Sequence, residues 1–283
     1  MNRQRIVAGY DGSAESGAAV RWAVAEAGRT GAALHIVHAY QPPWTVAYYD
    51  GVSAQAAADA ETLAEEKLDE LVAHLHERHA GVRVVATTVR GVPAPALLDA
   101  AATAGLLVVG NRGSGGLTNL LMGSVSQQVA THAAVPVAVV RGRSDADDGP
   151  VVVGVDGSPS TDAALALAFE QAASRGAELV AVRAYVPPPS VLPLSTVEAP
   201  ERAALQQSLT GWSEKYPAVK VRAVVAMGRA AEVLVGASRT ARLVVVGSRG
   251  HGGFTGLLLG SVGQQLMHHA ECPVLIAHRR EHP

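Results

Sequence analysis

The sequence predicts an α/β protein made of two tandem domains, each a five-stranded parallel, doubly wound open sheet with helices on both faces. Three observations support this fold class. The chain has 283 residues, enough for two domains of ordinary size. Short apolar runs alternate with amphipathic or alanine-rich stretches, as in parallel sheets covered on both faces. The order of these elements then starts again at Val151.

The elements of the first half follow from local sequence signals. Short apolar runs predict strands at residues 5–10, 33–39, 82–89, 106–109 and 135–140. Helical spacing of apolar residues predicts helices at residues 14–29, 56–79, 93–103 and 125–132. Ser13 is the expected N-cap of the first helix, and Gly31 is expected just past its end. Pro93 suits the first turn of the third helix.

The second half repeats this order. Residues 106–140 align with residues 243–277 without a gap, and about 20 of these 35 positions are identical. A polar, acidic segment with two glycines separates the copies and has the composition of a linker. We therefore expect a first domain at residues 1–141, a linker at 142–150 and a second domain at 151–283.

Bulk composition excludes several classes of function. The net charge of −2 gives no basic surface for nucleic acid or for a membrane. No apolar run approaches the roughly 18 residues of a membrane-spanning helix. The single cysteine, Cys272, allows no internal disulfide and favours a cytoplasmic location; we expect it to be a small buried residue.

A glycine-rich stretch occurs at the same place in both copies. In the first copy it follows an apolar run, and Gly110, Gly113 and Gly123-Ser124 have the spacing glycine, two residues, glycine, nine residues, glycine-serine. Such a turn directs backbone N–H groups and a helix N-terminus at an anion, and Gly110 and Gly113 can adopt positive φ and let a ligand approach the backbone. Arg112 adds a positive charge. The second copy keeps the same spacing with Gly247, Arg249, Gly250, Gly260 and Ser261.

Other readings of these residues stay open. The glycine stretch is also compatible with a tight strand-to-helix connection that binds nothing. It is neither a Walker A motif nor a dinucleotide fingerprint. Asp11 and Asp156 come directly after the first strand of each copy, where Asp-Gly is a good turn by itself. Because the carboxyl ends of parallel strands meet at one edge, a carboxylate there is also placed to hold Mg²⁺ between phosphates.

At this point the chain resembles a tandem universal stress protein of the ATP-binding kind. Both copies match that family's nucleotide motif, Gly-x2-Gly-x9-Gly-Ser/Thr, completely. The opening strand-to-Asp-Gly-Ser turn and the closing strand, with Val135-Pro136-Val137 and Cys272-Pro273-Val274, match as well. The resemblance implies a Rossmann-like sheet and one ATP in each domain, with Mg²⁺ on its phosphates.

The resemblance also implies roles for individual residues. Asp11 and Asp156 would lie near the ribose or the phosphates. Val37 to Ala39 and Val182 to Ala184 would lie along the adenine through main-chain contacts, and Gly91 and Gly228 would lie near adenine and ribose. The second copy has Ala230 where the first has Pro93. The phosphates would be held by the two glycine stretches together with Ser124, Val125, Ser261 and Val262.

The sequence supports three functional hypotheses. The first is an ATP-binding regulatory sensor or switch in a stress response, because the loops contain no lysine and no catalytic set is evident. The second is a slow Mg²⁺-dependent ATPase using Asp11 or Asp156. The third is an interaction scaffold whose nucleotide is structural. By resemblance, residues 135–140 are expected to pair with 274–277, and the tandem chain is expected to form a homodimer and to act on a regulatory protein partner.

Two further groups of residues call for an interpretation. Trp44, Tyr48 and Tyr49 lie in the long loop after the second strand, where a lid over the nucleotide is one possibility. His74, His76 and His79 lie on one helix but point in different directions, so we expect a solvated face rather than a metal site. His251 lies inside the second glycine stretch, where the first copy has Ser114.

Overall fold

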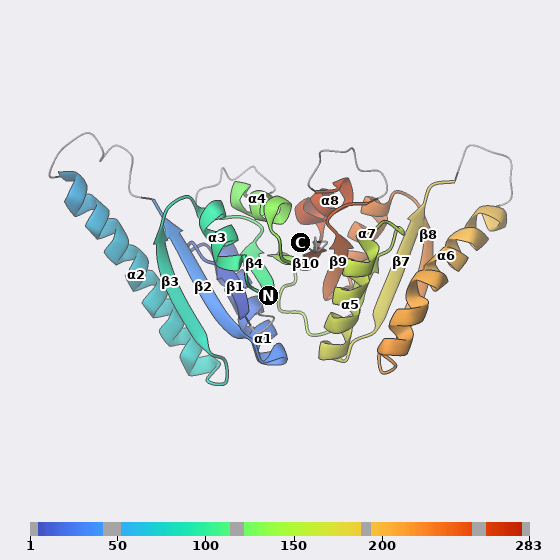
Figure 1. Ribbon diagram of the computed structural model, residues 1–283, viewed down its shortest axis with the longest axis horizontal. Coiled ribbons are helices and arrows are strands. Elements are labelled where there is room, and N and C mark those ends of the chain that lie inside the picture. Colours follow the sequence, from blue (N-terminus) through green and yellow to red (C-terminus); the bar gives the residue numbers. More distant parts are fainter. Residues whose placement is uncertain (1–4, 42–51, 114–121, 188–193, 251–258, 279–283) are drawn as a thin grey trace. The chain divides into compact units, whose positions relative to one another are not determined.

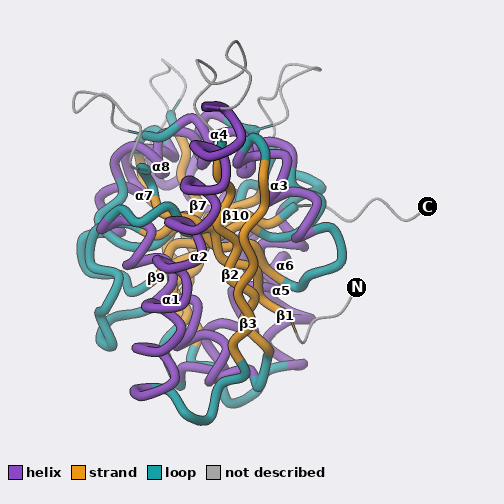
Figure 2. Tube along the Cα trace, turned by 90° about the vertical axis from the view of Figure 1, so that its left-hand side faces the viewer, coloured by secondary structure: helices purple, strands orange, loops and turns teal. Residues whose placement is uncertain are grey.

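The structure is a computed structural model that describes residues 5–41, 52–113, 122–187, 194–250 and 259–278. The chain divides into two compact units, Met1–Val135 and Pro136–Pro283. Both are α/β, with strands and helices alternating along the chain (Figures 1 and 2). The predicted fold class is confirmed.

The first unit contains a four-stranded parallel sheet in the order β3-β2-β1-β4. Adjacent strands pair residue by residue, without a bulge among the paired residues: Ile6 of β1 lies opposite both Leu34 of β2 and Leu106 of β4. Its elements are β1 (Arg5–Gly9), α1 (Ala14–Thr30), β2 (Ala33–Tyr40), α2 (Val52–Arg78), β3 (Val84–Arg90), α3 (Pro93–Ala101), β4 (Leu106–Gly110) and α4 (Ser124–His132).

Helices cover both faces of this sheet. A Cβ on Gly9 of β1 would lie 2.9 Å from Leu97 of α3, whereas a Cβ on Gly110 of β4 would lie 2.8 Å from the backbone of Glu15 in α1. The two glycines point to opposite faces, so α1 and α3 pack on opposite sides. Glycine is needed at both positions because helix and sheet approach too closely for a side chain.

The ends of α1 follow the sequence signals. Ser13 is its N-cap and accepts a hydrogen bond from Ser16 N at 3.1 Å, and Gly31 ends the helix with φ of 67°. The start of α2 was predicted four residues too late, at 56 instead of Val52. Ser53 and the small residues after it suit the end of a loop as well as a first helical turn, so the sequence does not mark this start sharply.

The second unit contains six strands in the order β5-β10-β9-β6-β7-β8. All neighbours are parallel except β5 and β10. Its elements are β5 (Val137–Val140), β6 (Val151–Gly154), α5 (Thr161–Arg175), β7 (Leu179–Tyr185), α6 (Leu194–Lys215), β8 (Val221–Met227), α7 (Ala230–Ser238), β9 (Leu243–Gly247), α8 (Ser261–His269) and β10 (Val274–Ala277).

The predicted pairing of the last strands of the two copies is confirmed. Val137 of β5 lies opposite Ile276 of β10, and the two strands run antiparallel. Five strands were expected in each copy. The compact units instead contain four and six strands, because β5 belongs to the second unit. Edge strands expose unpaired backbone groups, and β5 covers one edge of β10.

The segment that follows β5 is bound to the second unit. Arg143 N donates to Glu271 O at 2.8 Å, and the Arg143 guanidinium donates to Ala241 O at 3.1 Å. Arg242 Nε donates to Gly149 O at 2.7 Å. A Cβ on Gly142 would overlap the Glu271 backbone. The expected linker therefore folds back along the loops before β9 and β10, and we call residues 141–149 the strap.

Small aliphatic residues fill both cores, as expected from the low aromatic content. The second unit adds a ring cluster in which Phe169 of α5 stacks on Trp212 of α6 and on Tyr216, just past the end of that helix, with centroids 6.1 and 5.5 Å apart. Cys272 is fully buried, as expected, and burial raises its thiol pKa to about 12. Among the described helices, none combines the length and apolar character needed to cross a membrane.

Candidate functional site

Each unit has one point where the strand order reverses. In the first unit the chain passes from β1 to β2 and β3 on one side and then places β4 on the other side of β1. In the second unit β6 and β9 have the same relation. In open parallel sheets, the crevice at the carboxyl ends of two such strands is where ligands bind. The turn after β1 and the glycine stretch after β4 therefore meet at one place.

The turn after β1 holds the Asp11 carboxylate in a fixed position. Oδ1 of Asp11 accepts hydrogen bonds from Ser13 N at 3.0 Å and from Ser13 Oγ at 2.6 Å. Gly12 has φ of 84°, a conformation that glycine adopts without strain. Ser16, buried in the first turn of α1, accepts a hydrogen bond from Asp11 N at 3.3 Å. The turn interpretation of Asp11 is thus correct, and it leaves the second carboxylate oxygen directed at the glycine stretch.

The second unit builds the same turn with different hydroxyl groups. Oδ1 of Asp156 accepts from Ser158 N and from Thr161 Oγ1, both at 2.9 Å. Gly157 N donates to the same Thr161 hydroxyl at 3.1 Å. Ser16 and Thr161 occupy the same position in the repeat and were missed by the sequence reasoning. The shared hydroxyl five residues after each aspartate was the available signal.

The glycines of the motif are required for close approach rather than for positive φ. Gly110 and Gly113 do not use the positive φ that glycine allows. A Cβ on Gly113 would instead overlap Oδ2 of Asp11, and a Cβ on Gly250 would lie 2.6 Å from Oδ2 of Asp156. A Cβ on Gly247 would lie 2.7 Å from Cβ of Ser160. The glycine stretch therefore packs directly on the carboxylate and on the start of α1 or α5.

Hydrogen bonds join the two ends of each glycine stretch. Gly123 N donates to Asn111 O at 2.8 Å, and Gly260 N donates to Ser248 O at 2.7 Å. Gly123 is the N-cap of α4 and Gly260 that of α8, and neither helix start has a side-chain cap. The exposed Ser124 and Ser261 are the first residues of these helices, and the half-buried Val125 and Val262 follow them. First-turn N–H groups at such a start attract anions.

Arg112 and Arg249 have the same place in the motif but different surroundings. A Cβ on Gly123 would lie 3.3 Å from Cα of Arg112, so Arg112 adjoins the start of α4. Nε of Arg112 is buried and has no hydrogen-bond partner within the described part of the chain. Arg249 is exposed. A buried guanidinium nitrogen without an acceptor, in a residue whose Cα adjoins a helix N-terminus, fits an anionic ligand such as a phosphate.

The residues expected along the base lie at the neighbouring strand ends. Tyr10 N donates to Val37 O at 3.0 Å, and Gly91 N donates to Tyr40 O at 2.9 Å. Ala39 pairs with Val89 in the sheet. These bonds connect the ends of β2 and β3 to the Asp11 turn, but they already use the Val37 carbonyl and the Gly91 amide.

The second unit repeats these bonds. Val155 N donates to Val182 O at 2.9 Å, and Gly228 N donates to Tyr185 O at 2.8 Å. Ala184 pairs with Ala226. The expected main-chain contacts with a base therefore have to come from the remaining groups at these strand ends, in both units.

A buried histidine lies beside the turn of the first unit. The His38 ring meets the Tyr10 ring edge to face, with centroids 6.1 Å apart, and is 8% exposed. Nδ1 of His38 has no hydrogen-bond partner among the described residues. Burial lowers the His38 pKa, Lys67 of α2 lowers it further, and Asp11 opposes this. Sequence reasoning included His38 only in the range 37–39 expected along the base and gave its side chain no role.

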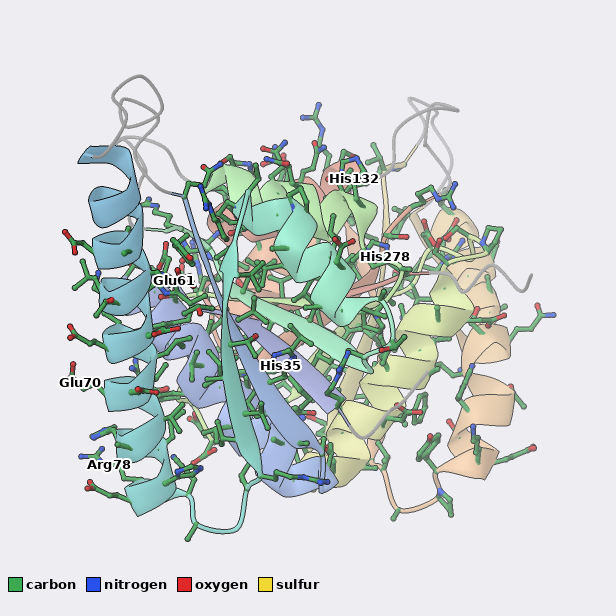
Figure 3. All side chains as sticks on the ribbon, turned by 60° about the vertical axis from the view of Figure 1, so that its left-hand side comes forward. His35, Glu61, Glu70, Arg78, His132 and His278 are labelled. Carbon is green, nitrogen blue, oxygen red and sulfur yellow. The ribbon has the colours of Figure 1, made fainter. Side chains whose placement is uncertain are left out.

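The corresponding residue of the second unit is Arg183, which forms an ion pair with Glu201 of α6. In the first unit, α2 approaches the strand ends through a different contact. Burial and the charge of Glu61, which also accepts a hydrogen bond from the Tyr40 hydroxyl, raise the pKa of that hydroxyl. Figure 3 shows Glu61 on α2 and His35 on β2. Nε2 of His35 lies 2.9 Å from Thr87 Oγ1 of β3. The two candidate sites thus differ in the side-chain contacts that α2 makes with β2 and that α6 makes with β7.

Some residues singled out from the sequence cannot be placed. Trp44, Tyr48, Tyr49, Ser114 and His251 lie outside the described residues. His74 and His76 of α2 are exposed, as expected for a solvated face.

Known proteins resemble the chain over almost its whole length. The model of the universal stress protein family matches residues 2–141 and again residues 149–278. A universal stress protein of Mycolicibacterium smegmatis is 38% identical over 286 residues, which cover 97% of each chain. One from Mycobacterium tuberculosis is 37% identical over 292 residues, or 96% of each chain.

One solved structure agrees in fold over nearly the whole chain. The crystal structure of a universal stress protein from Archaeoglobus fulgidus has a TM-score of 0.72 at 19% identity, covering 97% of this chain and 96% of that one. Another universal stress protein, solved in complex with cAMP, is 28% identical over 47% of this chain and 99% of its own, with a TM-score of 0.41. From the two matches to the family model and from these relatives, the chain belongs to the universal stress protein family, with two copies of the family domain in tandem.

Proposed function

We propose that each unit binds one ATP at its switch point and that the protein acts as a regulatory sensor or switch in a stress response. One observation carries the proposal: in both units an aspartate carboxylate, a glycine-rich turn and a helix start without a side-chain cap come together beyond the same two strands. Packing alone does not require all three features at both places.

The residues of each site suit different parts of a nucleotide. In the first unit, the N–H groups of Ser124 and Val125, together with Arg112, hold the phosphates, and the strand ends at Ala39 and Gly91 border the base and ribose. Mg²⁺, when bound with ATP, would supply the positive charge that lets triphosphate and carboxylate lie side by side. Asp11 is the residue that would help to hold that ion. The second unit uses Ser261, Val262, Arg249, Ala184, Gly228 and Asp156 in the same roles.

Slow Mg²⁺-dependent hydrolysis is the second candidate function. It is favoured by the position of Asp11 and Asp156, whose Oδ2 atoms lie against the glycine stretches. A carboxylate beside the phosphates can orient a water molecule as well as a metal ion. The motif supplies no lysine, and fast phosphoryl transfer requires more positive charge on the transferred group than one arginine brings.

The first experiment measures nucleotide in the protein as purified. The protein is denatured, the supernatant is chromatographed, and moles per chain are counted; Mg-ATP, Mg-ADP and cAMP are then titrated into stripped protein by calorimetry. About two moles of ATP per chain support two sites and a switch, whereas mainly ADP moves the assignment to the ATPase. A chain that carries no nucleotide and binds none of the three refutes the proposal.

We also propose that the tandem chain forms a homodimer in the cytoplasm and transmits its nucleotide state to a regulatory protein partner. Its single cysteine is in keeping with a reducing compartment. Light scattering with and without Mg-ATP tests the dimer, and a mass of one chain at high concentration in both conditions contradicts it. If partner binding and stability are both unchanged when nucleotide is removed, the switch and the scaffold with a structural nucleotide are contradicted together.

A further inference from the structure

The two sites contain the same motif but different local structure at its arginine. Arg112 is half-buried, and its Nε has no acceptor among the residues that the structure describes. Arg249, at the same position of the repeat, is exposed. A buried donor without an acceptor destabilises the ligand-free protein, whereas an exposed guanidinium is already hydrated. Before a ligand binds, the arginine of the motif is therefore buried at Nε without an acceptor in the first site and exposed to water in the second.

The serine of the Asp-Gly-Ser turn differs as well. In the first unit the Ser13 hydroxyl donates to Asp11 at 2.6 Å and accepts from Ser16 N at 3.1 Å. In the second unit Thr161 takes over the hydroxyl bond to Asp156, and Ser158 Oγ donates to Arg249 O at 3.4 Å. The Arg249 backbone is thus tied to the turn by a long hydrogen bond within the protein.

We propose that the first site binds the nucleotide more tightly than the second and that Arg112 is the residue responsible. This inference rests on the proposed function, since it concerns the same two sites. A phosphate at the start of α4 supplies the acceptor that Arg112 Nε lacks, and the bond forms where water is excluded. At Arg249 a phosphate replaces water on a solvated group, and such contacts contribute little. The protein then fills its sites in sequence as nucleotide rises.

The test is a calorimetric titration of the full chain, stripped of nucleotide, with Mg-ATP. Wild type, Arg112→Ala and Arg249→Ala form a matched set. We expect two affinity classes in wild type; Arg112→Ala weakens the tighter class by about tenfold or more, and Arg249→Ala leaves that class unchanged. Arg112→Lys retains the charge but lacks the Nε–H, and we expect it to stay close to Arg112→Ala.

Melting of the ligand-free variants separates this role from a structural one. Because Arg112→Ala removes a buried donor that lacks an acceptor, its melting temperature should equal or exceed that of wild type, while the shift caused by Mg-ATP shrinks. A clearly lower melting temperature without ligand, full recovery by Arg112→Lys, two equal classes, or loss of the tighter class in Arg249→Ala each overturns the inference and leaves the proposed function standing. Failure of wild type to bind Mg-ATP overturns the proposed function instead.

Discussion

Gly250 lies against the carboxylate of Asp156, so that a Cβ at residue 250 would stand 2.6 Å from Oδ2. Gly113 and Asp11 have the same relation in the first unit. Neither glycine has positive φ, so the steric requirement is set by the neighbouring carboxylate rather than by the backbone. The absence of a side chain at these positions lets the glycine stretch lie directly against the Asp11 and Asp156 carboxylates.

A methyl group at either glycine should therefore impair one site alone. Forcing an extra carbon into a packed contact costs about 1–3 kcal/mol, so Gly113→Ala should weaken Mg-ATP binding at the first site roughly tenfold, and Gly250→Ala should do the same at the second. Calorimetry measures both. Gly81→Ala is the control, because Gly81 is exposed and nothing lies within 4 Å of its added Cβ. Equal binding by Gly113→Ala and the control would contradict the packing argument.

Removing the carboxylate charge should reverse its effect when Mg²⁺ is withdrawn. Asp11→Asn retains an acceptor for Ser13 N at Oδ1. We expect weaker ATP binding than wild type in Mg²⁺, because an ion ligand is lost, and tighter binding in EDTA, because repulsion from the phosphates is relieved. Asp156→Asn should behave alike at the second site. The same direction of change in both buffers would show that Asp11 does not act through a metal.

His38 should make the first unit sensitive to mild acid. Its pKa is lowered in the folded protein, chiefly by burial, whereas the unfolded chain keeps a pKa of about 6.5. The unfolded state therefore takes up the proton first, and stability falls as the pH drops below about 6.5. Urea midpoints of wild type, His38→Phe and the exposed control His76→Phe at pH 7.5 and 5.5 measure this.

The loss between these pH values should be smaller in His38→Phe than in the other two proteins. His35 and His268, whose pKa values burial also lowers, keep part of the loss in every variant. A loss of equal size in all three proteins would assign the acid sensitivity to those residues instead.

Cys272 should report on opening of the second unit. Its thiol is fully buried with a pKa of about 12, so almost no thiolate is present at pH 8. Reaction with a disulfide reagent should be slow in native buffer and fast in denaturant. Mg-ATP should slow it further, because ligand binding stabilises the folded state. Rapid labelling of the native protein would mean that β10 opens locally without unfolding.

Much of this fold follows from local signals in the sequence. The cap at Ser13 and the helix end at Gly31 were predicted from local signals and are found. The pairing of residues 135–140 with 274–277 was predicted from the family resemblance, and β5 pairs with β10. The start of α2 was placed four residues late because its first turn has no distinctive sequence signal. Strand ends and caps are determined by a few neighbouring residues, which is why they can be predicted from one sequence.

The interior of the site was harder to predict. Arg112 and Arg249 are identical in type and motif position, yet one nitrogen is buried and the other side chain is exposed. Nothing in the sequence around His38 indicates that its ring is buried beside Tyr10 and close to Lys67 of α2. Such differences arise from contacts between segments far apart in the chain. A repeat in the sequence shows that the chemistry was duplicated, but it does not show that the surroundings are equal.

The unit that was duplicated and the unit that folds are different segments of this chain. By sequence, β5 and its continuation end the first copy, but they pair with β10 and bind Glu271 and Ala241 in the second unit. A gene cut at Val151, where the repeat restarts, would give a fragment with the bare edge of β10 exposed to other chains. A cut before Pro136 keeps that edge covered. Recombination that exchanged one sequence repeat between such proteins would therefore transfer a sheet without the strand that covers the edge of β10.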